Sequence, residues 1–309
     1  MSKIKRFFRF STFTLKKSNV RFSFSLIFLI IIQFNSSHIS TAESSTNNEI
    51  ETVINKEIHV GDTISIKVKK LEQEKGIPKI YFEKNKIPVF TLSDIWYRSL
   101  IPLSANTKPG KYPLEIYYRG KAKKLDVEIK STKYPLQELT LTKEVAALTA
   151  SKIEQALVAK ALSTVSNKKL WAGRFIYPSP ARQSTGYGVK RRVNGVINPD
   201  YFHKGLDFAA NQGSIIKSPE DGKVVLVGLQ SKGFVVNGNC IFIDHGHGVI
   251  SGYLHLSSIS VKEGDFVKKG QRIGKVGSTG IASGPHLHWG VYVLGKTVDP
   301  LGWTTMIIE

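Results

Sequence analysis

Short apolar runs broken by glycine fill the chain beyond Trp171, and this pattern limits what that part of the chain can fold into. The runs are rich in β-branched residues, which favour strands, and glycine marks the turns between them. Residues 171–309 are therefore predicted to form a compact, turn-dense antiparallel β domain. The interrupting glycines are Gly264, Gly270, Gly274, Gly277, Gly280 and Gly284.

A second β region precedes this domain and differs from it in pattern. From about Ile50 to Ser131 apolar and polar side chains alternate in short runs, which is typical of half-buried strands. Turn signals such as Lys108-Pro109-Gly110 separate the runs, so residues 43–135 are expected to form a small antiparallel β-sandwich. Between the two domains, residues 143–165 are rich in good helix formers, and residues 136–170 are predicted to be a linker helix. The fold class is mainly β.

The N-terminus has the pattern of an export signal. Seven cations and no acidic residue precede Glu43, and an apolar run from Phe22 to Phe34 follows the cations. The run is shorter than the ~20 residues of a membrane span, and Ser40-Thr41-Ala42 resembles a cleavage site. Residues 1–42 are interpreted as a signal peptide, with an uncleaved N-terminal anchor as the alternative. Either one predicts an exported protein of the periplasm or cell envelope, in the second case held at the membrane.

The chain is strongly basic, with a formal net charge of +20. Residues 1–42 hold seven of its 44 cations and none of its 24 acidic residues, so their removal would leave +13. No nucleic-acid motif accompanies the charge, which favours attraction to anionic envelope polymers; a lysine-rich solvated surface is the alternative. The single cysteine, Cys240, excludes an intramolecular disulfide, and its apolar surroundings predict a small buried side chain.

Six of the eight histidines lie in the last 107 residues, which points to a metal or acid-base site. In YFHKGLDFAA, alternation predicts a strand with His203, Gly205 and Asp207 on one face. In GPHLHWGV, His286 and His288 are two residues apart, a spacing that also aligns side chains on a strand. Two adjacent strands could therefore present all four groups to one point.

Zinc is the metal that such a set favours. Catalytic zinc commonly has three nitrogen or oxygen ligands from the protein and one open position, and two histidines with an aspartate supply this set. A structural site would close all four positions, and the fourth group of the cluster is available to do so. The pattern alone leaves both kinds of site possible.

Seven sequence blocks then occur in a recognisable order: YGVKR (187–191), HKGLDFAA (203–210), DGKVV (221–225), IDHGHGVISGYLHLS (243–257), VKEGDFVKKGQRIGKVGSTG (261–280), GPHLHWGV (284–291) and VDP (298–300). Over residues 171–303 the chain resembles the lysostaphin-type, or LytM-domain, zinc metallopeptidases, which are murein endopeptidases. The resemblance implies one zinc per chain, with His203, Asp207 and His288 as ligands. It implies that His255 and His286 are the catalytic histidines. His245 and His247 are expected to serve packing or backbone hydrogen bonding.

The activity that the resemblance implies is hydrolysis of peptide crosslinks in bacterial peptidoglycan, with stem peptides as substrate and no nucleic-acid partner. The protein is expected to be a monomer. The alternative is a non-catalytic envelope protein that binds the wall or activates another wall hydrolase. A third possibility, polyanion binding through the basic surface, is expected to accompany catalysis.

Overall fold

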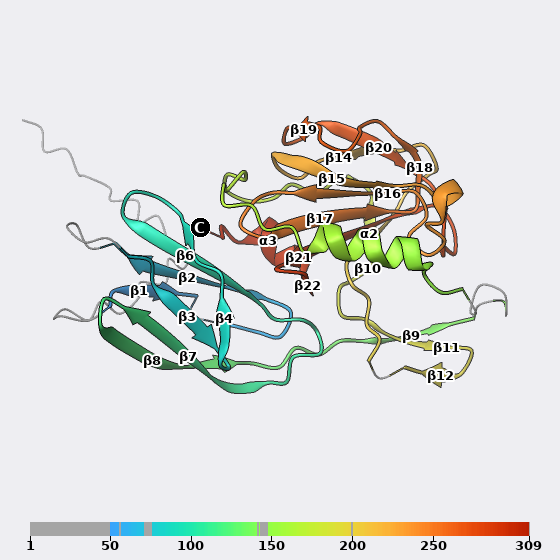
Figure 1. Ribbon diagram of the computed structural model, residues 1–309. Helices are drawn as coiled ribbons and strands as arrows, with labels where there is room; N and C mark the ends of the chain where they lie inside the picture. The colour runs from blue at the N-terminus through green and yellow to red at the C-terminus, as the bar shows by residue number, and fades with distance from the viewer. Residues whose placement is uncertain are drawn as a thin grey trace, which may run out of the picture. The chain divides into compact units, whose positions relative to one another are not determined.

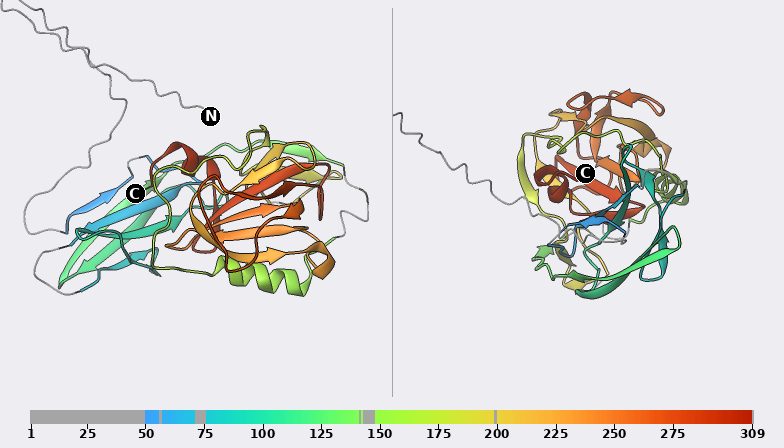
Figure 2. Two further views of the ribbon diagram at one scale, coloured as in Figure 1. Left: turned by 90° about the horizontal axis from the view of Figure 1, so that it is seen from above. Right: turned by 90° about the vertical axis from the view of Figure 1, so that its left-hand side faces the viewer.

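The computed structural model describes residues 50–55, 57–70, 76–140, 142, 148–198 and 200–308 (Figures 1 and 2). The predicted signal peptide or anchor at residues 1–42 lies outside these residues. Among the helices of the described part, none is both long and apolar enough to cross a membrane.

The first domain consists of two four-stranded sheets with one shared core. Alternating residues such as Ile64, Ile66 and Val68 from one sheet, and Leu114 and Ile116 from the other, are buried in the same apolar cluster. This arrangement is the predicted β-sandwich. In spatial order its sheets contain β1 (Thr52–Ile54), β2 (Thr63–Lys69), β6 (Trp96–Pro102) and β5 (Phe90–Thr91), and β4 (Asn85–Ile87), β3 (Lys79–Phe82), β7 (Gly110–Tyr118) and β8 (Lys121–Ile129).

The connecting segment differs in part from the predicted linker helix. Its first residues form strand β9 (Leu136–Leu139), which pairs in parallel with β11 (Lys190–Val193), itself paired with β12 (Val196–Ile197). This pairing satisfies backbone groups that a helix would have satisfied internally. Helix α2 (Lys152–Leu162) begins after Ser151, whose side chain accepts a hydrogen bond from the backbone N–H of Glu154. Residues 143–147 of the predicted helix lie outside the described residues.

The C-terminal domain is built on an eight-stranded antiparallel sheet. Its order is β10 (Arg182–Thr185), β13 (Leu206–Ala209), β21 (His286–Val293), β17 (Val249–Leu254), β16 (Cys240–Asp244), β15 (Gly222–Gly228) and β19 (Phe266–Val267), with β22 (Lys296–Val298) also paired to β21. A smaller sheet contains β14 (Ile215–Lys217), β20 (Arg272–Val276) and β18 (Leu256–Ile259). A 3-10 turn, η1 (Gln230–Lys232), and the short helix α3 (Pro300–Thr305) complete the domain. The prediction of a mainly β protein is confirmed.

The two faces of the large sheet have different neighbours. On β21, Leu287, Trp289 and Val291 point into the main core, whereas Tyr292 packs in the cluster that contains Ala161 of α2. Because side chains alternate along a strand, His286 and His288 lie on the same face as Tyr292. Helix α2 therefore covers part of the sheet face that carries these histidines, and Figure 1 shows it alongside the sheet.

Candidate metal centre

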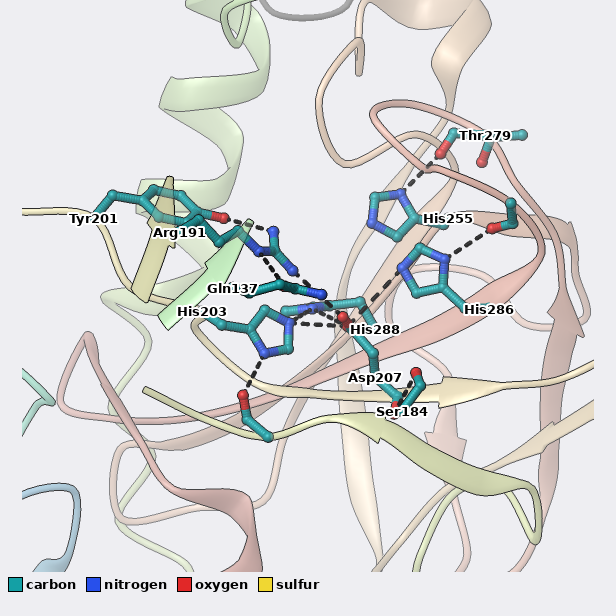
Figure 3. A network of polar contacts seen from close by, with 12 residues as sticks. Gln137, Ser184, Arg191, Tyr201, His203, Asp207, His255, Thr279, His286 and His288 are labelled. Carbon is teal, nitrogen blue, oxygen red and sulfur yellow. Dashed lines mark hydrogen bonds and ion pairs between the residues drawn. The ribbon is translucent and has the colours of Figure 1, made fainter. Parts of the chain in front are cut away.

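Strands β13 and β21 are antiparallel neighbours, and their register places Asp207 directly opposite His288. His203 comes from the extended segment before β13, which begins only at Leu206. This segment hydrogen-bonds to residues 188 and 189, with the His203 N–H donating to the Val189 carbonyl at 2.8 Å. The three side chains meet at one point, as Figure 3 shows.

The ligand atoms of this group form a nearly equilateral triangle. His203 Nε2 lies 2.9 Å from Asp207 Oδ1 and 3.0 Å from His288 Nδ1, and the last two atoms are 2.9 Å apart. Metal–ligand distances of about 2.0–2.1 Å in a tetrahedral zinc site separate ligand atoms by roughly 3.3 Å, so a small outward shift of each group would admit the ion. The donor set and its spacing fit zinc. Among the described residues, this is the group of three histidine, cysteine or acidic side chains close enough to share a metal.

Hydrogen bonds and burial prepare each group to act as a ligand. The His203 Nδ1–H donates to the Gly186 carbonyl at 2.7 Å, which leaves the Nε2 lone pair facing the centre. Burial tends to raise the pKa of Asp207, but its contacts with His203 and His288 outweigh burial and hold the pKa well below the ordinary value. Burial lowers the pKa of His288, so its imidazole stays neutral. The arrangement offers one carboxylate and two imidazole groups as candidate ligands.

Gly205 allows the two strands to approach this closely. A β-carbon at this position would lie 2.3 Å from the Trp289 carbonyl oxygen and 2.9 Å from His288 Nε2. Both separations are shorter than van der Waals contact, so any larger residue would push β13 and β21 apart. The glycine in the HKGLD block is therefore a requirement for the position of His288.

His255 and His286 lie beside the triangle, and the centroids of their two rings are 4.8 Å apart. The Nδ1–H of His255 donates to the Thr279 carbonyl at 2.8 Å, and that of His286 donates to the Gly284 carbonyl at 2.9 Å. In the neutral form of each ring the lone pair is therefore on Nε2. His286 Nε2 is 3.9 Å from Asp207 Oδ1, and the His255 ring centroid is 6.3 Å from that of His288. Burial lowers the pKa of His255 to about 3.

The position of His286 bears on the choice between a catalytic and a structural site. It lies outside the three-residue group of candidate ligands, next to it and on the same strand as His288. Three candidate ligands, with a neighbouring histidine that is not one of them, favour the open, catalytic type of zinc site over the closed type.

Arg191 is a neighbour of the candidate metal centre that residue patterns did not single out. Its Nη2 lies 3.6 Å from Asp207 Oδ2, while Gln137 and Tyr201 accept hydrogen bonds from its Nε and Nη1. Figure 3 shows this group on one side of the metal ligands and His255 with His286 on the other. Arg191 falls inside the YGVKR block, but the role of Gln137 depends on the β9–β11 pairing, which has no clear sequence signal.

The other two histidines of the C-terminal domain lie in the turn between β16 and β17 and are buried. His245 contacts the Asp221 carbonyl through Nδ1 at 2.8 Å and the Ser251 hydroxyl through Nε2 at 2.7 Å. His247 contacts the Asn167 carbonyl through Nε2 at 2.9 Å. Neither belongs to the group of candidate metal ligands. Cys240 is also fully buried, and burial raises its pKa to about 12.

The buried His245 predicts a loss of stability in acid. Burial lowers its pKa from 6.5 to about 4, so between these pH values the unfolded chain binds a proton that the folded chain does not. Stability contributed by the neutral ring is therefore lost as pH falls through this window, at about 1.4 kcal/mol per pH unit and about 3 kcal/mol in total. The free energy of unfolding, measured with urea at a series of pH values, should depend less steeply on pH for His245→Asn than for the unmodified chain. Equal dependence on pH would contradict the lowered pKa of His245.

A model of Peptidase family M23 matches residues 201–300, which include all five histidine and aspartate residues of the site. A protein of Haemophilus influenzae described as an uncharacterized metalloprotease is 41% identical over 130 residues, which is 41% of this chain. The peptidoglycan DD-endopeptidase ShyB of Vibrio cholerae is 39% identical over 120 residues, or 38% of this chain. The chain spans 26% of the length of each of these relatives.

A solved structure extends the similarity beyond the matched segment. A crystal structure described as a peptidase M23 from Pseudomonas aeruginosa is 28% identical, with a TM-score of 0.59. The superposition covers 81% of this chain and 96% of that one. The similarity therefore includes residues on the N-terminal side of the C-terminal domain.

Proposed function

Because residues 201–300 are a domain of peptidase family M23, we propose that this protein is a zinc metalloendopeptidase that hydrolyses peptide crosslinks of bacterial peptidoglycan. The observation that carries the proposal is the triangle of His203, Asp207 and His288, with the rings of His255 and His286 held beside it through their Nδ1 atoms. Relatives named peptidoglycan DD-endopeptidases support the choice of substrate. The bond is accordingly proposed to be a D-alanyl to meso-diaminopimelate crosslink.

His203, Asp207 and His288 would hold the zinc ion, which when bound polarises the scissile carbonyl as a Lewis acid. The chain itself supplies the proton transfers. His255, whose pKa is lowered by burial, is neutral at neutral pH, and in the neutral form of either ring the Nε2 lone pair can accept a proton. One ring removes a proton from the attacking water, and a protonated ring later donates to the leaving amine. Fixing both rings through Nδ1 limits their rotation and keeps Nε2 directed at the substrate.

The surroundings of the protein are part of the proposal. A peptidoglycan substrate requires an envelope location, in agreement with the signal or anchor predicted at residues 1–42. The basic surplus of the chain favours retention on anionic envelope polymers, a contact that should weaken with salt. The stem peptides of the wall are the proposed partners.

The proposed activity is tested with purified full-length protein and defined crosslinked muropeptides, analysed by mass spectrometry. Cleavage should add one water per bond broken, should stop on removal of metal with a chelator, and should return when zinc is restored. The masses of the products identify the bond. A folded, zinc-loaded protein that binds wall fragments but cleaves none would overturn the proposal in favour of a wall-binding or activator protein.

A further inference from the structure

Helix α2 contains a buried acidic side chain that bonds to a segment outside the helix. Glu154 is 1% exposed, and its carboxylate accepts the backbone N–H groups of Val235 and Val236 at 3.0 and 3.1 Å and of Asn237 at 2.7 Å. A buried carboxylate is costly unless it is hydrogen-bonded, and bonds to a charged acceptor are stronger than neutral ones. Three such bonds fix the segment 235–237 to the helix.

A further hydrogen bond joins α2 to the same connection between β15 and β16. The Ser151 hydroxyl, at the N-terminus of α2, donates to the Gly233 carbonyl at 2.8 Å. The start of the helix is thus attached at both ends of residues 233–237, which lie in the connection between β15 and β16.

The anchored segment in turn holds the backbone of His255. The His255 N–H donates to the Asn237 carbonyl at 3.0 Å, and the Leu256 N–H donates to the Asn239 carbonyl at 2.9 Å. His255 has a φ of 65°, in the left-handed region that non-glycine residues rarely adopt. A backbone in this region persists only where its surroundings fix it. The Asn237 carbonyl therefore accepts a hydrogen bond from the His255 N–H, while the Asn237 N–H donates to the Glu154 carboxylate.

The ring of His255 depends on the same segment. Its Nδ1 partner is the carbonyl of Thr279, and the Thr279 hydroxyl accepts the Asn239 N–H at 3.0 Å. A β-carbon on Gly238 would lie 2.4 Å from the Thr279 carbonyl carbon, so the two backbones are in direct contact. Displacement of residues 237–239 would therefore move both the backbone and the ring of His255.

We propose that Glu154 is a positioning residue for His255, acting through residues 235–239 to set the direction of its ring. The inference rests on the proposed function for its catalytic consequence. It assigns a role to a helix outside residues 201–300, the segment that matches the peptidase family. The metal ligands lie on β13, β21 and the segment before β13, which none of the three Glu154 hydrogen bonds reaches.

The test uses zinc-loaded full-length chain and the variant Glu154→Gln. Glutamine keeps the shape and one acceptor oxygen but turns its NH2 group toward backbone N–H donors. The expected result is a fall in kcat by roughly 10- to 100-fold on crosslinked muropeptides, with KM and bound zinc little changed. Gln155→Ala, at an exposed position on the same helix, is the matched control and should retain activity.

Hydrogen exchange gives a readout that does not depend on activity. In Glu154→Gln the amides of residues 235–239 and of His255 and Leu256 should lose protection, while those of β21 keep theirs. Unchanged exchange at His255, or an unchanged kcat, would overturn the proposal, as would a loss of kcat that merely follows loss of folded protein or zinc. If the unmodified chain is inactive, the proposed function fails, and exchange still decides whether Glu154 positions His255.

Discussion

Replacing His288 with alanine should remove both bound zinc and hydrolytic activity. His288 Nδ1 is one corner of the ligand triangle, 2.9 Å from Asp207 Oδ1 and 3.0 Å from His203 Nε2. Two remaining ligands cannot keep the ion under dilute conditions. Since Lewis-acid stabilisation is worth several kcal/mol and about 1.4 kcal/mol changes a rate tenfold, cleavage of muropeptides should fall by about 10³-fold or more.

Zinc content by elemental analysis and cleavage rate by chromatography measure the two effects together. His59→Ala is the matched control, because it removes a histidine from the N-terminal β-sandwich and leaves all five residues of the site in place. Circular dichroism of the His288→Ala protein should retain the β signal, since the β13–β21 backbone pairing does not involve this side chain. Full activity in the His288→Ala variant would refute the proposed metal centre.

Replacing His255 or His286 with alanine should slow the reaction without removing the metal. General acid-base catalysis by a positioned side chain contributes about 10²- to 10⁴-fold, so kcat should fall within this range for each variant. Zinc should stay near the level of the unmodified chain, because neither ring belongs to the three-residue ligand group.

The double variant adds information about how the two histidines act. If both rings serve one proton-transfer path, the loss in the double variant will be smaller than the product of the two single losses. Loss of zinc together with kcat in His286→Ala would instead identify His286 as a fourth ligand. That outcome would favour the closed, structural type of site.

The strand pattern predicted most of the fold and placed the residues of the candidate metal centre on strands. Alternation of apolar and polar residues predicted the sandwich, and the spacing of His286 and His288 predicted that they share one strand face, as β21 shows. Alternation in YFHKGLDFAA predicted a strand that includes His203, yet β13 starts only at Leu206. His203 reaches the ligand group from an extended segment that hydrogen-bonds to residues 188 and 189. Local periodicity cannot reveal this, because the partners lie outside its window.

The residues that support the site were harder to predict, because their partners are also distant in the sequence. Ser151 and Glu154 have the spacing of a helix capping box, in which the glutamate turns back onto its own helix. Here the serine caps the helix, but the carboxylate binds the backbone of residues 235–237, more than 80 positions away. A local motif can thus predict that a helix begins, yet not which distant segment its side chain anchors. Gln137 beside Arg191 is a similar case, since it depends on a parallel strand pairing.

The register of β13 and β21 also has a consequence for when the candidate metal ligands come together during folding. Asp207 and His288 are 81 positions apart, and β17 and β16 fill the next places in the sheet. Contacts between such distant positions form slowly, because the entropy of closing a long loop is lost before the contact is gained. The complete set of candidate ligands is therefore available only after these distant strands have paired. A nascent or truncated chain without β21 lacks His288 and with it one of the three candidate ligands.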